Sequence, residues 1–180
     1  MGLPARSADH SGKRMIIENG RTILDDGRIF ETLRPADDWR AITQAGGLME
    51  GKTRGRCLRP WFEDEDLIYF AKGLEPRDGE IILVELPFER GPTLGAQQLR
   101  WEPSAKQLRT VDGKRWITCA DGAVELDETH IVEGRRIKIG KVIGTAVAIV
   151  RSPREPLPPI AEINFEIDAH SWKHGRAQLA

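Results

Sequence analysis

The stretch that decides the fold is GRCLRPWFEDEDLIYF, residues 55–70, followed after a short turn by RDGEIILVEL, residues 77–86. In it, Cys57 is followed by Pro60, by an acidic turn centred on Asp66 and then by two apolar runs. Short runs of β-branched and aromatic residues, bounded by Gly, Pro and Asp, are typical of strands. The order therefore predicts two strands that follow a candidate nucleophile.

The composition bounds the class of protein. A chain of 180 residues is one domain with appendages, or a small domain pair. With 39% hydrophobic and 31% charged residues it is an ordinary globular chain. The net charge of −1 provides no overall basic surface, so we expect no nucleic-acid binding by the chain alone. Two cysteines are too few for a disulfide framework and fit a reducing compartment.

Membrane and export signals are missing from the sequence pattern. No apolar run approaches the roughly 20 residues that a membrane helix needs. The first residues, MGLPARSADHSGKR, do not contain the apolar core of a signal peptide. We therefore expect no membrane insertion and a cytoplasmic location.

Residues 1–51 predict hairpins and a short helix. Asn19-Gly20 and Asp26-Gly27 are typical dipeptides of type I′ turns, whose two central residues both need positive φ. Asp37 is the expected N-cap of the helix, and Gly46-Gly47 its expected end. Nothing in this segment has the two-helix pattern of a helix-turn-helix.

Residues 52–152 predict mainly strands, and residues 153–180 a proline-rich extension and a polar tail. Glycines within a strand mark bends or bulges, as expected at Gly140 and Gly144. The fold class is therefore all-β with one or two short helices. The predicted strands are residues 67–70, 81–84, 115–118 after the Asp112-Gly113 turn, 136–150 and 163–167.

This order of elements resembles the catalytic domain of the LexA-like self-cleaving repressors and the signal-peptidase-like fold. That family's pattern is Ser-Met-x-Pro, a turn with Gly-Asp, a strand, and a second strand after Gly-Asp. Here Cys57 stands at the position of the serine, Leu58 replaces the methionine, and Pro60 matches. Glu65-Asp66 and Asp78-Gly79-Glu80 stand at the two Gly-Asp positions.

The rest of the middle segment extends the resemblance. The family's general-base lysine commonly lies in Val-Lys-Arg-Leu, which resembles Ala105-Lys106-Gln107-Leu108. KRWITCADGAVEL, residues 114–126, and IKIGKVIGTAVAIVR, residues 137–151, resemble the two segments that follow. The resemblance implies a coiled-sheet domain of this type over residues 52–152, extended by the amino-terminal hairpins and by the carboxyl-terminal segment.

The resemblance also implies a catalytic dyad of Cys57 as nucleophile and Lys106 as base, with the backbone of Leu58 as oxyanion donor. A lysine in apolar surroundings loses its proton near neutral pH, and a thiol needs less activation than a hydroxyl. Alternatively, Cys57 is a small buried hydrophobic residue and Lys106 a solvated strand lysine. Ala45-Gly46 has the identity of a self-cleavage bond, but also that of a helix end.

Three functions stay open. We expect a non-catalytic interaction or assembly module of a phage or prophage, because cysteine replaces serine and a DNA-binding module is missing. Such a module would bind a protein partner or a second copy by strand addition, in the cytoplasm or within a phage assembly. The alternatives are an active cysteine/lysine peptidase and a repressor-type regulator without its DNA-binding domain. His170 and His174 have the spacing of metal ligands but no third ligand nearby, so we expect neither metal nor cofactor.

Overall fold

The computed structural model describes residues 7–8, 14–15, 20–54, 58–59, 61–89, 99–119, 122–126, 129–132, 135–138 and 140–153. Within them the chain is mostly antiparallel strand, with very little helix, which confirms the all-β prediction. Helical structure there is limited to a 3-10 turn, η1 (Ala36–Asp38), and the five-residue α1 (Arg40–Gln44). Neither segment has the length or the apolar character to cross a bilayer.

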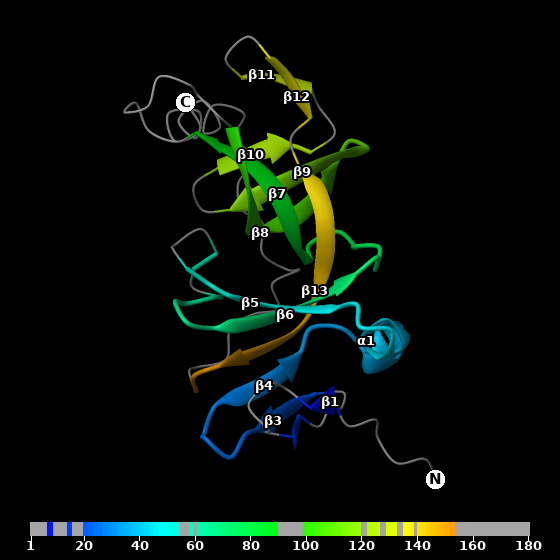
Figure 1. Cartoon of the computed structure of the whole chain (residues 1–180), viewed down its shortest axis with the longest axis vertical. Helices are drawn as coiled ribbons and strands as arrows, with labels where there is room; N and C mark the ends of the chain where they lie inside the picture. The colour runs from blue at the N-terminus through cyan, green and yellow to red at the C-terminus, as the bar shows by residue number, and fades with distance from the viewer. Residues whose placement is uncertain are drawn as a thin grey trace.

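The strands are numbered in chain order and drawn in Figure 1. They are β1 (Ser7–Ala8), β2 (Arg14–Met15), β3 (Arg21–Ile23), β4 (Ile29–Thr32), β5 (Leu48–Lys52), β6 (Leu67–Lys72), β7 (Ile81–Glu89), β8 (Leu99–Val111), β9 (Lys114–Cys119), β10 (Gly122–Glu125), β11 (Thr129–Val132), β12 (Arg135–Lys138) and β13 (Lys141–Arg151). Two short hairpins, β1–β2 and β11–β12, form separate sheets, and the other strands share one sheet.

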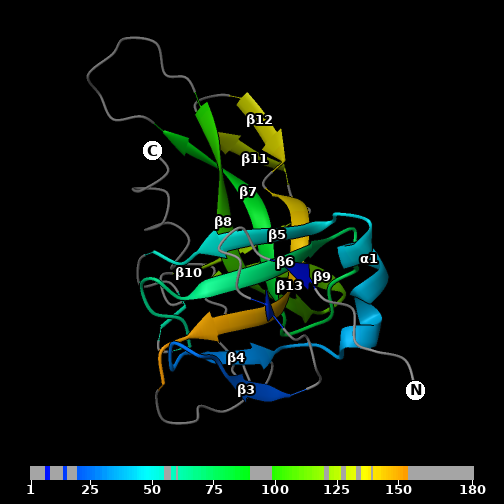
Figure 2. The ribbon, with the colours of Figure 1, turned by 60° about the horizontal axis from the view of Figure 1, so that its bottom comes forward.

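Strand β13 is the centre of that sheet. Its first half pairs with β7 and its second half with β4, while β6 pairs with it along the opposite edge. The strand order is β10-β9-β8-β7-β13-β4-β3, with β6 and then β5 beyond the other edge of β13. Figure 2 shows β5, β6, β13, β4 and β3 side by side. The predicted strands at residues 67–70 and 81–84 therefore share this sheet with β13. The single predicted strand at residues 136–150 is wrong: it is divided at Gly140, which has a positive φ of 86°, into β12, in the separate β11–β12 hairpin, and β13.

Strand β13, which pairs with three strands, contains two register shifts. Its register shifts between Val142 and Gly144 against β7, and between Ala146 and Ala148 against β6. An extra residue in a strand reverses the alternation of its side chains. Accordingly Ala146 and Ile149, three positions apart, lie in the same core cluster. The bend that the glycine pattern predicts near Gly144 coincides with the first of these shifts.

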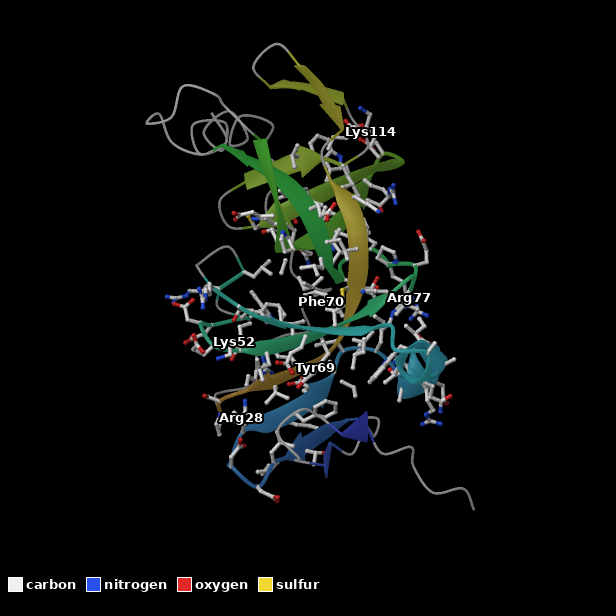
Figure 3. The ribbon with its side chains drawn as sticks, in the orientation of Figure 1. Arg28, Lys52, Tyr69, Phe70, Arg77 and Lys114 are labelled. Carbon is white, nitrogen blue, oxygen red and sulfur yellow. The ribbon has the colours of Figure 1, made fainter. Side chains whose placement is uncertain are left out.

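Strand β6 separates two of the three hydrophobic clusters. Tyr69 packs on one side, in the cluster that contains Trp39, and Phe70 on the other, in the cluster that contains Cys119. Their side chains are labelled in Figure 3. Such alternation is expected of a strand that is covered on both faces. A third cluster, on β7 to β10, consists of Ile82, Val84, Leu86, Leu108, Ile117, Val124 and Leu126.

The hairpin at Asp26-Gly27 forms, but the predicted type I′ turn is wrong. Only Gly27 has positive φ, 80°, because the described non-glycine residues with positive φ are Glu65 and Asp112. The N–H of Gly27 donates to Leu24 C=O over 2.9 Å, closing a three-residue loop with a glycine bulge. The Asp26 carboxylate accepts the backbone N–H of Arg28 at 3.1 Å, which supports this longer loop. Asn19 lies outside the described residues.

The short helix is confirmed, but its predicted cap is not. Pro35 and Trp39 hold the two N-cap positions without a side-chain hydrogen bond, and Asp37 lies inside η1. The predicted end is correct: Gly46 has φ of 74°, and the N–H of Gly47 donates to Ile42 C=O over 2.8 Å. The Ala45-Gly46 bond is thus part of a helix terminus.

The amino-terminal segment adds strands to the main sheet rather than standing apart from it. The β3–β4 hairpin pairs with β13, and β5, which crosses the predicted boundary at residue 52, pairs with β6. Arg34, whose side chain is 4% exposed, forms an ion pair with Glu80 at 2.6 Å and donates to Glu75 C=O at 3.2 Å. The three-segment division stays a prediction, since residues after 153 lie outside the described ranges.

Replacing Gly140 by alanine should destabilise the protein more than replacing Gly113. Both have positive φ, 86° and 75°, which costs a residue with a Cβ about 1–2 kcal/mol. A Cβ at Gly140 would also lie 2.5 Å from Leu126 Cδ1 and 2.8 Å from Val84 Cγ2, whereas at Gly113 no atom lies within 4 Å. Overpacking should add about 1–3 kcal/mol. Urea denaturation measures both variants, and equal losses would contradict this account.

Candidate functional site

The described residues bring one amine and one thiol into contact. Lys106 Nζ, on β8, donates to Cys119 Sγ, at the end of β9, over 3.2 Å. Cys119 is a free cysteine, 7% exposed, and the contact itself is partly buried. Lys106 has intermediate burial, and its amine has a thiol as a hydrogen-bond partner.

The turn between β8 and β9 places these two side chains opposite each other. Asp112 and Gly113 have φ of 52° and 75°, so they form a two-residue turn in which both central φ angles are positive, as in type I′. This turn pairs Val111 with Lys114, and the ladder continues to Gln107 opposite Thr118. The next positions along the two antiparallel strands are Lys106 and Cys119.

A buried polar network holds this register. Gln107 and Thr118 are both 0% exposed. The Gln107 side chain donates to Gly79 C=O over 3.1 Å, and the Thr118 hydroxyl donates to the Gln107 carbonyls over 3.4 Å. A buried polar group without its partner costs about 1–3 kcal/mol. The network therefore fixes β8 against β9 and against the turn at residues 78–80.

The loop that carries the predicted nucleophile reaches the same cluster. Leu58 is 6% exposed and lies with Phe62 and Cys119 in one hydrophobic cluster. Its C=O accepts the N–H groups of Trp61 and Phe62, which forms a turn. Cys57 and Pro60 lie outside the described residues. The Cys57–Lys106 dyad and the oxyanion role of Leu58 therefore stay predictions. Leu58 shares a hydrophobic cluster with Cys119, and Lys106 forms a hydrogen bond with Cys119.

The two acidic turns have structural partners. Asp66 is 4% exposed, and its carboxylate accepts the N–H of Glu63 over 2.8 Å. Asp78 accepts the N–H of Thr110 over 2.5 Å, which ties the second turn to β8. Carboxylates at these positions thus order the turns that precede β6 and β7.

An ion pair clamps the base of the 53–65 loop. Lys52 Nζ lies 2.8 Å from Glu65 Oε2, and the N–H of Glu65 donates to Thr53 C=O over 3.2 Å. The hydrogen bond from Lys52, together with its positive charge, lowers the pKa of the Glu65 carboxyl below its usual value. Lys52 is labelled in Figure 3 on the side of the molecule where β5 ends.

Cys119 is the site residue that the sequence analysis missed. The signal was present, because a two-residue turn at Asp112-Gly113 determines which residues of the two strands face each other. Counting outward from that turn places Cys119 opposite Lys106. Among the residues described, no group of three or more His, Cys, Asp or Glu side chains could hold a metal ion, and His170 and His174 lie outside the described ranges.

Comparisons with known proteins returned no match: neither a family model, nor a curated protein, nor a solved structure matches this chain.

Removing Lys52 should raise the pKa of Glu65. In Lys52→Met the carboxyl loses its hydrogen bond and the nearby charge, so its pKa should return toward the ordinary value. Because the folded pKa is depressed, the pair's stabilisation is present above the unfolded pKa and is lost as pH falls through the folded pKa. NMR titration of the Glu65 side chain measures the shift. Lys114→Met, which removes the ion pair with Glu125, is the control that should leave Glu65 unchanged.

Proposed function

We propose that this chain is a non-catalytic interaction or assembly module built on a LexA-type, peptidase-like sheet. The observation that carries the proposal is the 3.2 Å contact between Lys106 Nζ and Cys119 Sγ. In a lysine-dependent peptidase the amine takes the proton of a nucleophile that the substrate can reach. Here the amine donates to a thiol that is 7% exposed and lies in an apolar cluster. This arrangement supports a structural role for the lysine.

The second candidate is a cysteine peptidase in which Cys57 attacks and Lys106 is the base. One observation favours it: Leu58, the next residue after Cys57, lies in the same cluster as Cys119. In this function the Lys106 amine would serve the thiol of Cys57 while it keeps its contact with Cys119. Cys119 would then orient the amine instead of replacing the nucleophile.

Incubation at neutral and alkaline pH separates the two functions. The wild type, Cys57→Ala and Lys106→Ala are incubated alone and with casein, and intact masses are recorded. The proposed module leaves all masses unchanged, because no activated nucleophile is present. A peptidase produces fragments faster at alkaline pH, where the lysine is deprotonated, and loses this activity in both variants. Such fragments would overturn the proposal.

The sheet edges support a role in association. In the described part of the chain β3, β5 and β10 each pair with a single neighbour: β4, β6 and β9 respectively. A free strand edge presents N–H and C=O groups to which a partner strand can hydrogen-bond. On β3, Ile23 is 75% exposed, so its side chain can be changed without disturbing the core. We propose β3 as the edge to which a protein partner or a second copy adds.

A charge on β3 should weaken association. Size-exclusion chromatography with light scattering is expected to show a dimer or a co-purifying protein for the wild type. Ile23→Lys should reduce that species several-fold, since a lysine on an edge strand opposes strand addition. Val111→Lys, at a 39% exposed site next to the β8–β9 turn, is the matched control and should behave as wild type. A monomeric wild type without a co-purifying protein would contradict this role.

A further inference from the structure

We propose that Lys106 and Cys119 are a redox-modification site, at which hydrogen peroxide causes a covalent sulfenamide bond between Nζ and Sγ. The two atoms lie 3.2 Å apart, within the roughly 3–3.5 Å that characterises near-attack geometry. This inference does not rest on the proposed function, because the bond can form whether or not the chain cleaves peptides.

The first step oxidises the thiol by two electrons. A neighbouring ammonium favours the thiolate, which is the reactive form of cysteine. The Cys119 thiolate attacks one oxygen of hydrogen peroxide and breaks the O–O bond. The leaving hydroxide takes a proton from the Lys106 ammonium and becomes water. The products are a sulfenic acid on Cys119 and a neutral amine on Lys106, side by side.

The second step joins the two residues without a further oxidant. The nitrogen lone pair of Lys106 attacks the sulfur, the S–N bond forms and the S–O bond breaks. The departing hydroxide combines with one proton of the amine to give a second water. Sulfenic acids are known to condense with nitrogen in this way when a nitrogen is the nearest nucleophile. The net change in the protein is the loss of two hydrogen atoms.

The surroundings favour this product over further oxidation. Cys119 lies among Leu58, Phe62 and Phe70, and its 7% exposure leaves access for a small peroxide but not for a bulky thiol. Gln107 and Thr118, both fully buried, hold the two strands in register, so the amine stays beside the sulfur. The bond would tie β8 to β9 and would prevent Lys106 from acting as a base.

The test uses the full chain with Cys57→Ala, in which Cys119 is the sole cysteine. After treatment with hydrogen peroxide, intact mass should show the loss of two hydrogen atoms in most of the protein. A thiol reductant should restore the original mass once the protein is unfolded in denaturant, which opens the buried sulfur to the reductant. Peptide mapping should join the peptide of Lys106 to that of Cys119. An intermolecular disulfide is distinguished by its doubled mass.

The matched control is Lys106→Arg in the same background, with Lys106→Met as a second variant should the first fail to fold by circular dichroism. In both variants, peptide mapping should place one to three oxygen atoms on the peptide that contains Cys119, as the thiol is oxidised to the sulfenic, sulfinic and sulfonic acids; this peptide contains no methionine, which peroxide also oxidises. Loss of two hydrogens in these variants would assign the bond to a backbone nitrogen and overturn the proposal. Oxygen on that peptide, or no change in it, in the Cys57→Ala protein that retains Lys106 would overturn the proposal equally. Peptide fragments, the readout for catalysis, are separate from all of these masses.

Discussion

The hydrogen bonding of β13 is the constraint on which the rest of the structure depends. Every residue from Thr145 to Val150 is at most 3% exposed, so the backbone groups of this stretch need partners within the protein. Three strands supply them: β6 along one edge, and β7 followed by β4 along the other. The pairing changes from β7 to β4 between Thr145 and Ala148, which is also where the register of β13 against β6 shifts. The two halves of the sheet are therefore joined through a single strand.

The small residues of β13 and β6 make this arrangement possible. A Cβ on Gly144 would lie 3.0 Å from Met49 Cε and 3.1 Å from Ala71 O, closer than ordinary contacts allow. Ala146 lies in the cluster that contains Cys119, and Ala148 in the cluster that contains Trp39. Small side chains on β13 thus leave room on both faces for the larger side chains of β6, Tyr69 on one face and Phe70 on the other.

The sequence predicted the elements that depend on neighbouring residues alone. The strands of residues 67–70, 81–84 and 115–118 and the helix end at Gly46-Gly47 follow from composition and from positive φ. The pairing of β13 with three strands could not be predicted, because it joins residues that lie 56 to 122 positions apart in the chain. Two local predictions were wrong, at Asp37 and Asp26. Each has a residue type that is common in caps and turns, but Asp37 lies inside η1, and the loop at Asp26 has three residues instead of two.

The two halves of the predicted dyad are held by different kinds of constraint. The position of Lys106 follows from a two-residue turn, and a slip of one residue would move its side chain to the other face of the sheet and away from Cys119. The loop of Cys57 is joined to the described structure by the Lys52–Glu65 clamp on one side and by the buried Leu58 and Phe62 on the other. The register of β8 and β9 places the Lys106 amine 3.2 Å from Cys119 Sγ. Any chemistry proposed for Lys106 therefore has to include this thiol as a neighbour of the amine.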